Sequence, residues 1–391
     1  MKHDPYYLEF LTKNPYPRTL RALDFFQGSA PFYVYNKGKK LINFSSSDYL
    51  GLSQHPELIA RCEAYATTLG VGSSASRLVT GNFSVYQDIE QKLAESIGKP
   101  AALILGSGYQ TNLSVLNTLL HQQLFNQQPR VFCDRLCHAS MIEAVRYSTH
   151  VYRFAHNTFD HLIVLLKKYA NSGAPLFILA ESIYSMEGDA SNLAELVEIA
   201  DHYQAFLYID DAHAVGVYGN KGWGKTVAYA DQIDIIMGTF SKALGCYGGF
   251  IGCSIPLKEY LVNQCKGLIY STGLPPPILG AIAAVIELLP KLDKERDRLI
   301  TLSKSTRDFF IENDISIGQS TTHIIPWIIG DAVKTRYASQ LLEGQGILGT
   351  AIQPPSIPTG KSRIRFCLSA MHSDEDIEAL WRSVKLVRDQ L

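Results

Sequence analysis

The stretch Thr239-Phe240-Ser241-Lys242-Ala243-Leu244-Gly245 is the first indication of how this chain of 391 residues folds. It follows residues 233–238, a short apolar run typical of a buried strand, so Lys242 is expected where a strand ends. A lysine amine that is partly withdrawn from water has a lowered pKa and becomes a nucleophile towards carbonyl groups. The alternative is one solvated lysine among 36 lysines and arginines, and the heptapeptide alone favours this alternative.

A second apolar run, residues 206–211, reverses that preference because it ends in carboxylates and is followed by His213. Ligands of open α/β sheets bind at the carboxyl ends of strands, where Asp210 and Lys242 are both expected. Pyridoxal phosphate needs a lysine that holds its aldehyde and a carboxylate that keeps its ring nitrogen protonated. The two stretches therefore resemble the fold type I pyridoxal phosphate enzymes of the aspartate-aminotransferase-like class. That resemblance implies a mostly parallel central sheet and a smaller C-terminal α/β domain.

The composition of the chain limits what kind of protein it is. Hydrophobic residues make up 46% and charged residues 19%, which is typical of a soluble globular protein. The formal net charge of −1 gives no indication of a nucleic-acid surface. The N-terminus lacks an apolar signal core, and the apolar stretch at residues 278–286 is too short to span a bilayer. We therefore expect a cytoplasmic protein without a membrane span.

The seven cysteines are scattered and none has C-x-x-C spacing, so reduced, buried thiols are expected. Cys133, Cys137 and His138 lie close together in the sequence. Because no second pair of ligands follows at zinc spacing, we expect no metal site.

The order of predicted elements indicates an alternating α/β chain. Strands are expected at residues 101–105, 130–134, 176–182, 206–211 and 233–238, with helical stretches between them. This alternation predicts a mostly parallel sheet. We divide the chain into an N-terminal arm (1–44), a large cofactor-binding α/β domain (45–275) and a small C-terminal α/β domain (276–391).

The two flanking parts have patterns of their own. In the arm, residues 32–42 are expected to form a hairpin around a turn at 36–38. After three prolines at 275–277, one long helical stretch is expected to about residue 302. Strands at 322–329 and 362–369 and a closing amphipathic helix at 374–391 are expected to follow.

Two glycine-containing segments are candidates for phosphate binding. Residues 106–112 place a glycine turn before a helix, where free backbone N–H groups and the helix dipole favour an anion. The third glycine of a dinucleotide fingerprint would fall at Thr111, which argues against a nicotinamide cofactor. Residues 219–226 match the G-x-x-x-x-G-K-T loop of NTPases, but the preceding strand ends near Asp211 rather than directly before the motif. An NTPase that uses Lys225 and Thr226 stays open as a minor alternative.

From about Arg21 to the C-terminus, the chain resembles the α-oxoamine synthases. These enzymes join an amino acid to an acyl-CoA thioester with loss of carbon dioxide. The motifs that carry the resemblance are residues 47–52, 75–81, 138–140, 210–213, 239–242 and 363–365. Each motif is weak alone, and their order along the chain makes the match specific.

The resemblance implies roles for single residues. Lys242 would hold pyridoxal phosphate and later move the substrate Cα proton, and Asp210 would pair with the ring nitrogen. His138 would stack on the ring, although a structural histidine is the alternative. The remaining cofactor-binding residues would be Gly108 and Tyr109 at the phosphate, Ser185 and Thr239 around the ring oxygen and phosphate, His213 at the ring hydroxyl, and Ser271 and Thr272. The last two resemble a segment that reaches a neighbouring subunit's cofactor, which implies an obligate homodimer.

The substrate side of the resemblance concerns an amino acid and an acyl thioester bound to CoA or to a carrier protein. Arg365 would clamp the amino-acid carboxylate, a task that suits a planar guanidinium; a surface strand arginine is the alternative. Arg21, Ser47 and Ser356 would also face the substrate.

Within the family, residues 154–157, 268–272 and 354–358 most resemble the biotin-pathway members, which condense L-alanine with a pimeloyl thioester. Three positions depart from the family pattern. Ser47 stands where asparagine is usual, Tyr86 where histidine is common, and Gln353 where at least one member has arginine. A sister synthase with another acyl donor, such as a 2-amino-3-ketobutyrate ligase or a long-chain amino-ketone synthase, therefore stays open.

Overall fold

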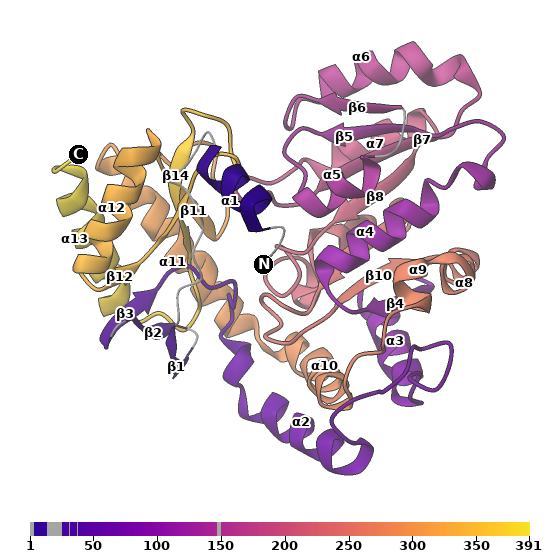
Figure 1. The fold of residues 1–391 in the computed structure, drawn as a ribbon, viewed down its shortest axis with the longest axis horizontal. Coiled ribbons are helices and arrows are strands. Elements are labelled where there is room, and N and C mark those ends of the chain that lie inside the picture. The colour runs from indigo at the N-terminus through magenta and orange to yellow at the C-terminus, as the bar shows by residue number, and fades with distance from the viewer. Residues whose placement is uncertain (1–3, 14–25, 31, 37, 147–149) are drawn as a thin grey trace.

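The computed structural model describes residues 4–13, 26–30, 32–36, 38–146 and 150–391. Its largest element is a seven-stranded sheet in the order β4-β10-β9-β8-β7-β5-β6 (Figure 1). The strands are β4 (Ala101–Leu105), β5 (Arg130–Asp134), β6 (Val151–Phe154), β7 (Leu176–Glu181), β8 (Phe206–Asp210), β9 (Ile235–Thr239) and β10 (Gly249–Cys253). Only β10 is antiparallel to its neighbours, so the sheet is mostly parallel, as predicted.

Helices cover both faces of this sheet, which is why its strands are continuous apolar runs. Successive side chains point to opposite faces: Val131 and Cys133 pack on one side, and Phe132 packs on the other. The helices around the sheet are α2 (Pro56–Leu69), α3 (Val85–Ser96), α4 (Gly108–Leu119), α5 (Ala139–Val145), α6 (Phe159–Tyr169), α7 (Leu193–His202), α8 (Ile255–Gln264), α9 (Lys266–Ile269) and α10 (Pro276–Leu288).

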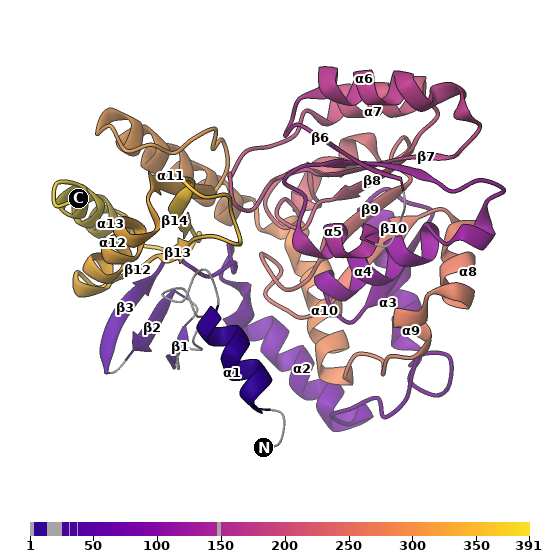
Figure 2. The same ribbon diagram turned by 45° about the horizontal axis from the view of Figure 1, so that its top comes forward.

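The C-terminal part is built on a small antiparallel sheet in the order β11-β14-β13 (Figure 2). Its elements are α11 (Asp293–Glu312), β11 (Ile324–Gly330), α12 (Ala332–Gly344), β12 (Ile347–Leu348), β13 (Thr350–Ile352), β14 (Ser362–Cys367) and α13 (Asp374–Arg388). The closing helix begins with a capping box between Ser373 and Asp376. The predicted closing helix and the two predicted C-terminal strands are confirmed.

The N-terminal arm joins this C-terminal part. β2 (Tyr33–Asn36) and β3 (Lys39–Asn43) form the predicted hairpin, β1 (Gln27–Ala30) pairs with β2, and β3 pairs in parallel with β12. α10, by contrast, packs on α2 beside the large sheet. The division at residues 44/45 and 275/276 stays a prediction.

The structure corrects some sequence expectations. The single helix expected from the prolines to residue 302 is two helices, because Pro290 interrupts α10 before α11 starts at Asp293. The strands β1, β6, β10, β12 and β13 were not predicted. They are only two to five residues long, and β10 contains two glycines, so their apolar pattern is weak.

The phosphate-loop alternative at residues 219–226 is wrong. These residues form short 3-10 turns at Asn220–Gly222 and Lys225–Tyr229, without the required strand and helix. The Asp211 carboxylate accepts from the Thr226 amide at 3.1 Å and from its hydroxyl at 2.6 Å. The threonine that would bind a metal in an NTPase is therefore buried against a carboxylate.

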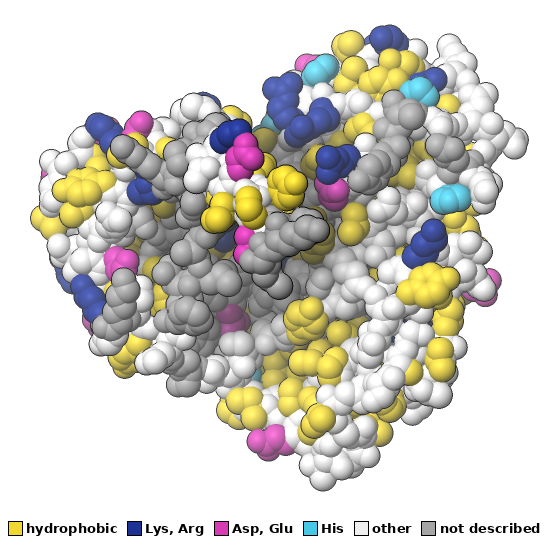
Figure 3. Space-filling view, in the orientation of Figure 1, with side chains coloured by type: hydrophobic (Ala, Val, Ile, Leu, Met, Phe, Trp, Pro, Cys, Tyr) yellow, Lys and Arg dark blue, Asp and Glu magenta, His cyan; other side chains and the backbone are white. Residues whose placement is uncertain are grey.

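The helix α1 (Asp4–Lys13) has no buried residue. Tyr6, Tyr7 and Phe10 are about seven-tenths exposed, and Figure 3 shows hydrophobic side chains near the middle of this face. Among the described residues, no helix combines the length and apolarity needed to cross a membrane.

His156 ties together two strand ends and a loop of the large sheet. Its Nδ1 lies 3.0 Å from Asp134 Oδ1, and its Nε2 lies 2.8 Å from Asp189 Oδ2. Burial lowers the pKa of His156, but the hydrogen bonds and charges of the two aspartates outweigh burial and raise it to about 10. The imidazolium is therefore part of the folded structure at neutral pH.

We predict that His156→Gln destabilises the protein in a pH-dependent way. The folded-state pKa lies above the unfolded value of 6.5, so the stabilisation is complete below pH 6.5 and is lost as pH rises through about 10. Urea unfolding at pH 6 should give a loss of roughly 3 kcal/mol, which shrinks towards pH 10. His202→Gln, at an exposed position at the end of α7, is the matched control. A loss that does not change with pH would contradict this prediction.

Candidate active site

Lys242 lies in the loop that follows β9, as predicted. The neighbouring side chains of Phe240, Ala243 and Leu244 are buried and anchor the loop. The Thr239 hydroxyl lies 2.8 Å from both the Ser241 hydroxyl and the Gly248 carbonyl, which closes the turn around the lysine. The amine is therefore held on a fixed loop at the carboxyl edge of the sheet.

The electrostatic surroundings of Lys242 favour its neutral, nucleophilic form. Burial lowers the pKa of Lys242, the carboxylates of Asp210 and Glu181 oppose this effect, and the positive charge of Arg365 adds to it. Glu181 and Asp210 are register partners on adjacent parallel strands, β7 and β8. Burial, with the nearby Asp210 charge, raises the pKa of Glu181 well above its usual range. The alternative of an ordinary solvated lysine does not fit this environment.

Asp210 is buried at the end of β8, and both of its oxygens have partners. Oδ1 accepts from the Ala212 amide at 3.0 Å, and Oδ2 accepts from Asn112 Nδ2 at 2.7 Å. Each carboxylate oxygen keeps a lone pair, so the group can still accept from a protonated ring nitrogen.

His138 lies at the N-terminus of α5, and its backbone amide donates to Glu181. The side chain is exposed and accepts from the Ser140 amide at 3.2 Å. Desolvation lowers the pKa of its imidazole, Lys242 adds to this effect, and Asp210 opposes it. A neutral, accessible ring beside Asp210 and Lys242 fits the predicted stacking position.

Two further histidines, His213 and His323, lie close enough to Lys242 for its charge to act on them. His213 Nδ1 is 2.7 Å from the hydroxyl of buried Tyr49, and the ring of Tyr49 contacts His323 edge-on at 4.1 Å. Burial lowers the pKa of His213 well below its usual range, and the charges of Lys242 and Arg365 add to this effect. Burial also lowers the pKa of His323 to about 3. Both rings are therefore neutral at physiological pH.

Two arginines two residues apart on β14 have different surroundings. Arg363 donates to the Met186 carbonyl and to Glu187, both at 2.8 Å, and so fastens β14 to the loop after β7. The Nε of Arg365 is buried and has no partner among the described residues, although the charge of Arg365 acts on Lys242 and His213. A buried guanidinium nitrogen near the lysine that has no partner among the described residues suits a ligand carboxylate.

The expected phosphate seat is formed at the start of α4. Ser107 caps the helix, and no group within the described part of the chain accepts the N–H of Gly108 or Tyr109. A Cβ at Gly108 would come within 3.4 Å of the Thr239 hydroxyl, so this helix end lies beside the loop that carries Lys242. Free amides, a helix dipole and a hydroxyl fit a phosphate group.

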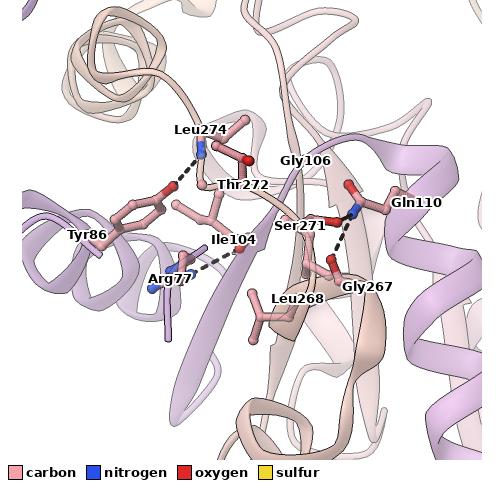
Figure 4. A pocket seen from close by; sticks show the side chains of 12 residues that line it. Arg77, Tyr86, Ile104, Gly106, Gln110, Gly267, Leu268, Ser271, Thr272 and Leu274 are labelled. Atoms are coloured by element: carbon pink, nitrogen blue, oxygen red, sulfur yellow. Dashed lines mark hydrogen bonds between the residues drawn. The ribbon is translucent and has the colours of Figure 1, made fainter. Parts of the chain in front are cut away.

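Ser271 and Thr272 lie in a small pocket at the side of this seat, which Figure 4 shows. The Ser271 hydroxyl accepts from Gln110 Nε2 at 2.8 Å, and Thr272 forms a β-bridge with Ser76. On the far wall, the Leu274 amide donates to the Tyr86 hydroxyl at 2.8 Å. Tyr86, which replaces the common histidine, therefore holds the segment that carries Ser271 and Thr272.

The other predicted residues are less closely connected. Ser47 hydrogen-bonds Tyr49, Ser185 lies in the loop after β7, and Ser356 lies in the loop between β13 and β14. Arg21 falls outside the described residues. The roles of all the site residues stay predictions.

Comparison with known proteins identifies the family. A family model for class I and II aminotransferases matches residues 39–384. A candidate 8-amino-7-oxononanoate synthase of Paramagnetospirillum magneticum is 45% identical over 348 residues, which is 89% of this chain and 88% of that protein. The 8-amino-7-oxononanoate synthase of Gluconacetobacter diazotrophicus is 42% identical over 385 residues, 97% and 96% of the two chains.

A solved structure of SPT with PLP superposes with a TM-score of 0.90 at 26% identity and covers 100% of this chain and 98% of that one. The chain belongs to the α-oxoamine synthase family. Its fold is the predicted fold type I, it is an acyltransferase, and its cofactor is pyridoxal phosphate. In this α-oxoamine synthase, that cofactor fits the free amides at the start of α4 and the half-buried Lys242. A carboxylate substrate fits Arg365 Nε, which has no partner among the described residues.

Sequence reasoning missed four residues that the fold brings to this site: Tyr49, Asn112, Glu181 and His323. Glu181 ends a predicted strand, so its position at the same sheet edge as Asp210 was a usable signal. Asn112 was only recognised as part of a helix start. His323 comes from the C-terminal part, and nothing in its sequence surroundings indicates contact with Tyr49.

We predict that the two β14 arginines have different functions, so that changing each to glutamine affects a different property of the enzyme. Arg365→Gln should raise the KM for the amino acid about 10- to 100-fold, because a charge-assisted hydrogen bond contributes roughly 1.5–3 kcal/mol. Arg363→Gln should instead lower the thermal midpoint, because it removes the bonds to Met186 and Glu187. Steady-state kinetics and thermal unfolding of both variants test this. Equal KM effects would contradict the assignment of Arg365 to the substrate.

Proposed function

We propose that this protein is an 8-amino-7-oxononanoate synthase of biotin biosynthesis. It would join L-alanine to a pimeloyl thioester, with release of carbon dioxide and the thiol. The observation that carries the proposal is the cluster of Lys242, Asp210 and His138 beside the unpartnered Nε of Arg365. The relatives at 42–45% identity support the choice within the family.

The residues divide the work of the reaction as follows. Arg365 binds the alanine carboxylate, and Asp210 keeps the ring nitrogen of the cofactor protonated. When bound, pyridoxal phosphate supplies an electron sink for the charge that develops at Cα. Lys242, with its lowered pKa, is the base that takes the Cα proton and later returns one. The new bond joins Cα to the acyl carbon, and the bonds that break are the thioester C–S bond and the bond from Cα to the carboxylate.

One contact supports an acidic acyl chain. Arg336 of α12 donates to Gln353 Oε1 at 2.5 Å, so a guanidinium contacts Gln353, which stands where at least one member of the family has arginine. Ser356 follows in the same loop, and its amide donates to the Gln353 carbonyl at 3.0 Å. Although position 353 carries glutamine instead of arginine, Arg336 therefore still supplies positive charge to this part of the protein.

A sister synthase with a long, neutral acyl donor is the second candidate. The observation that favours it is the TM-score of 0.90 with SPT, together with serine in place of asparagine at position 47. A hydrophobic acyl pocket discriminates by only about 1–3 kcal/mol per methylene, so the donor has to be identified by assay.

We also propose a cytoplasmic homodimer with shared active sites. The segment 270–273 supports this proposal, because Tyr270 is 81% exposed beside Ser271 and Thr272. An exposed tyrosine of this kind suits a subunit interface.

A substrate panel tests the proposed reaction. Release of thiol by the cofactor-loaded enzyme should be fastest with L-alanine and a pimeloyl thioester, compared with glycine or L-serine and with acetyl, succinyl or palmitoyl thioesters. Lys242→Ala should lower turnover by at least about 1,000-fold, because it removes the acid–base group together with the covalent anchor. Preference for palmitoyl would favour the sister synthase, and full turnover by Lys242→Ala would exclude the mechanism.

Mixing two inactive variants tests the shared site. Lys242→Ala and Thr272→Val protomers should each have low activity, and co-expression should restore a fraction of it. In the mixed dimer, one site combines the native Lys242 of one subunit with the native Thr272 of the other. Sedimentation should show a dimer in each case. Absence of restoration in verified mixed dimers would contradict a contribution of Thr272 across the interface.

A further inference from the structure

The side chain of Asn112 lies between two predicted cofactor-binding residues, Asp210 and His138. It belongs to α4 and is 1% exposed. Its Nδ2 lies 2.7 Å from Asp210 Oδ2 and 2.9 Å from Ser140 Oγ, and its Oδ1 lies 2.7 Å from the Tyr208 hydroxyl. Both N–H groups of the amide therefore donate to groups inside the protein.

The chemistry of the partners fixes the orientation of this amide. An ionised carboxylate can only accept, so the amide nitrogen faces Asp210 and the amide oxygen faces the Tyr208 hydroxyl. Burial raises the pKa of Tyr208 well above its usual range, so the phenol keeps its proton and donates. The second N–H of Asn112 then donates to Ser140 Oγ.

Ser140 connects Asn112 to His138. Its hydroxyl oxygen accepts from Asn112 Nδ2 and lies 2.8 Å from His138 Nδ1, to which it donates when that nitrogen carries no proton. The backbone amide of Ser140, which can only donate, points at the same nitrogen at 3.2 Å. Two donors face His138 Nδ1, so this nitrogen carries no proton and the ring proton is on Nε2.

We propose that Asn112 is a positioning residue that orients the Asp210 carboxylate and the Ser140 hydroxyl, and that this hydroxyl, together with the Ser140 backbone amide, holds His138 as the tautomer protonated at Nε2. The proposal rests on the pyridoxal phosphate site of the family and not on the identity of the acyl donor. The Asn112 amide thereby connects Asp210, the predicted partner of the cofactor's ring nitrogen, with His138, which is predicted to stack on the face of that ring.

The charged groups around His138 agree with a neutral ring. Lys242 and desolvation lower the pKa of the imidazole, and Asp210 acts in the opposite direction. Glu181 accepts from the backbone amide of His138, and the ring of Tyr109 lies 6.3 Å away edge-on. With Nδ1 turned to Ser140, Nε2–H is the polar group that the ring offers to a molecule in the site.

Other side chains at position 112 would not do the same work. Aspartate could not donate to Asp210 and would place a second carboxylate beside it. Leucine would remove the described partners of the Tyr208 hydroxyl and of Asp210 Oδ2. A carboxamide of this length supplies two donors and one acceptor.

Two readouts test the proposal, one on the cofactor-loaded enzyme and one on the apoprotein. The first is the ¹⁵N spectrum of labelled histidines, with His138 identified by its loss in His138→Gln. The second is the dissociation constant of pyridoxal phosphate, measured by titrating the apoprotein. Neither readout uses an acyl substrate, so an error in the proposed function leaves the test unaffected.

Asn112→Leu should weaken cofactor binding by at least about tenfold, because a charge-assisted hydrogen bond to Asp210 is lost. It should also shift the His138 ¹⁵N signals, because the Ser140 hydroxyl that bonds to Nδ1 loses the Asn112 donor that orients it. Ser140→Ala should change the His138 signals and leave the dissociation constant within about threefold. Asn117→Leu, at an exposed position of the same helix, is the matched control and should change neither readout.

Asn112→Asp is the second variant should the leucine protein not fold, since it keeps the volume of the side chain. It should weaken cofactor binding at least as much as Asn112→Leu does, because it places a second negative charge beside Asp210. Unchanged His138 signals or an unchanged dissociation constant in a folded Asn112 variant would overturn the proposal. If Ser140→Ala weakens cofactor binding as much as Asn112→Leu does, the claim that Asn112 supports cofactor binding through its own bond to Asp210 is overturned.

Discussion

The structure of the site depends on keeping one lysine amine partly withdrawn from water among opposing charges. Burial and Arg365 favour the neutral amine of Lys242, and Asp210 and Glu181 favour its protonated form. Parallel pairing of β7, β8 and β9 brings Glu181, Asp210 and the loop of Lys242 to one edge, because the carboxyl ends of neighbouring parallel strands coincide. With an antiparallel neighbour at β8, one of the carboxylates would lie at the opposite edge. The topology therefore sets the reactivity of the lysine.

The second requirement is contact between the large sheet and the C-terminal part. Arg363 of β14 and the Thr322 hydroxyl both bond to the loop after β7, the latter at the Gly188 carbonyl at 2.7 Å. Gly188 has φ +68, and a Cβ there would overlap the Ile324 carbonyl, so only glycine allows this close approach. These contacts fix the register that places Arg365 near Lys242. The substrate clamp and the nucleophile thus come from different sheets held by a few polar bonds.

Neighbouring carboxylates in the sequence have unlike environments. Asp210 faces Asn112 and the site, whereas Asp211 faces Ser182 and the glycine-rich turn at 219–226. Burial raises the pKa of Asp211 to about 6, and its hydrogen bonds to Ser182 and Thr226 oppose this effect. The turn that imitates a phosphate loop therefore serves to cover a buried carboxylate. Successive side chains of a strand point to opposite faces, which separates the two roles.

The sequence by itself determined the parallel strands, the positions of Lys242 and Asp210 at strand ends, and the helix start at Gly108, because apolar runs and glycine turns are local signals. The sequence pattern did not predict short strands such as β10, because their apolar pattern is weak, or the end of α10 before Pro290, because the helical pattern continues after it. Only the tertiary structure decided that Tyr49 meets His213, that Arg365 keeps a free nitrogen, and that Asn112 links Asp210 to Ser140. These contacts join residues 28 to 164 positions apart, and no local pattern specifies such pairs.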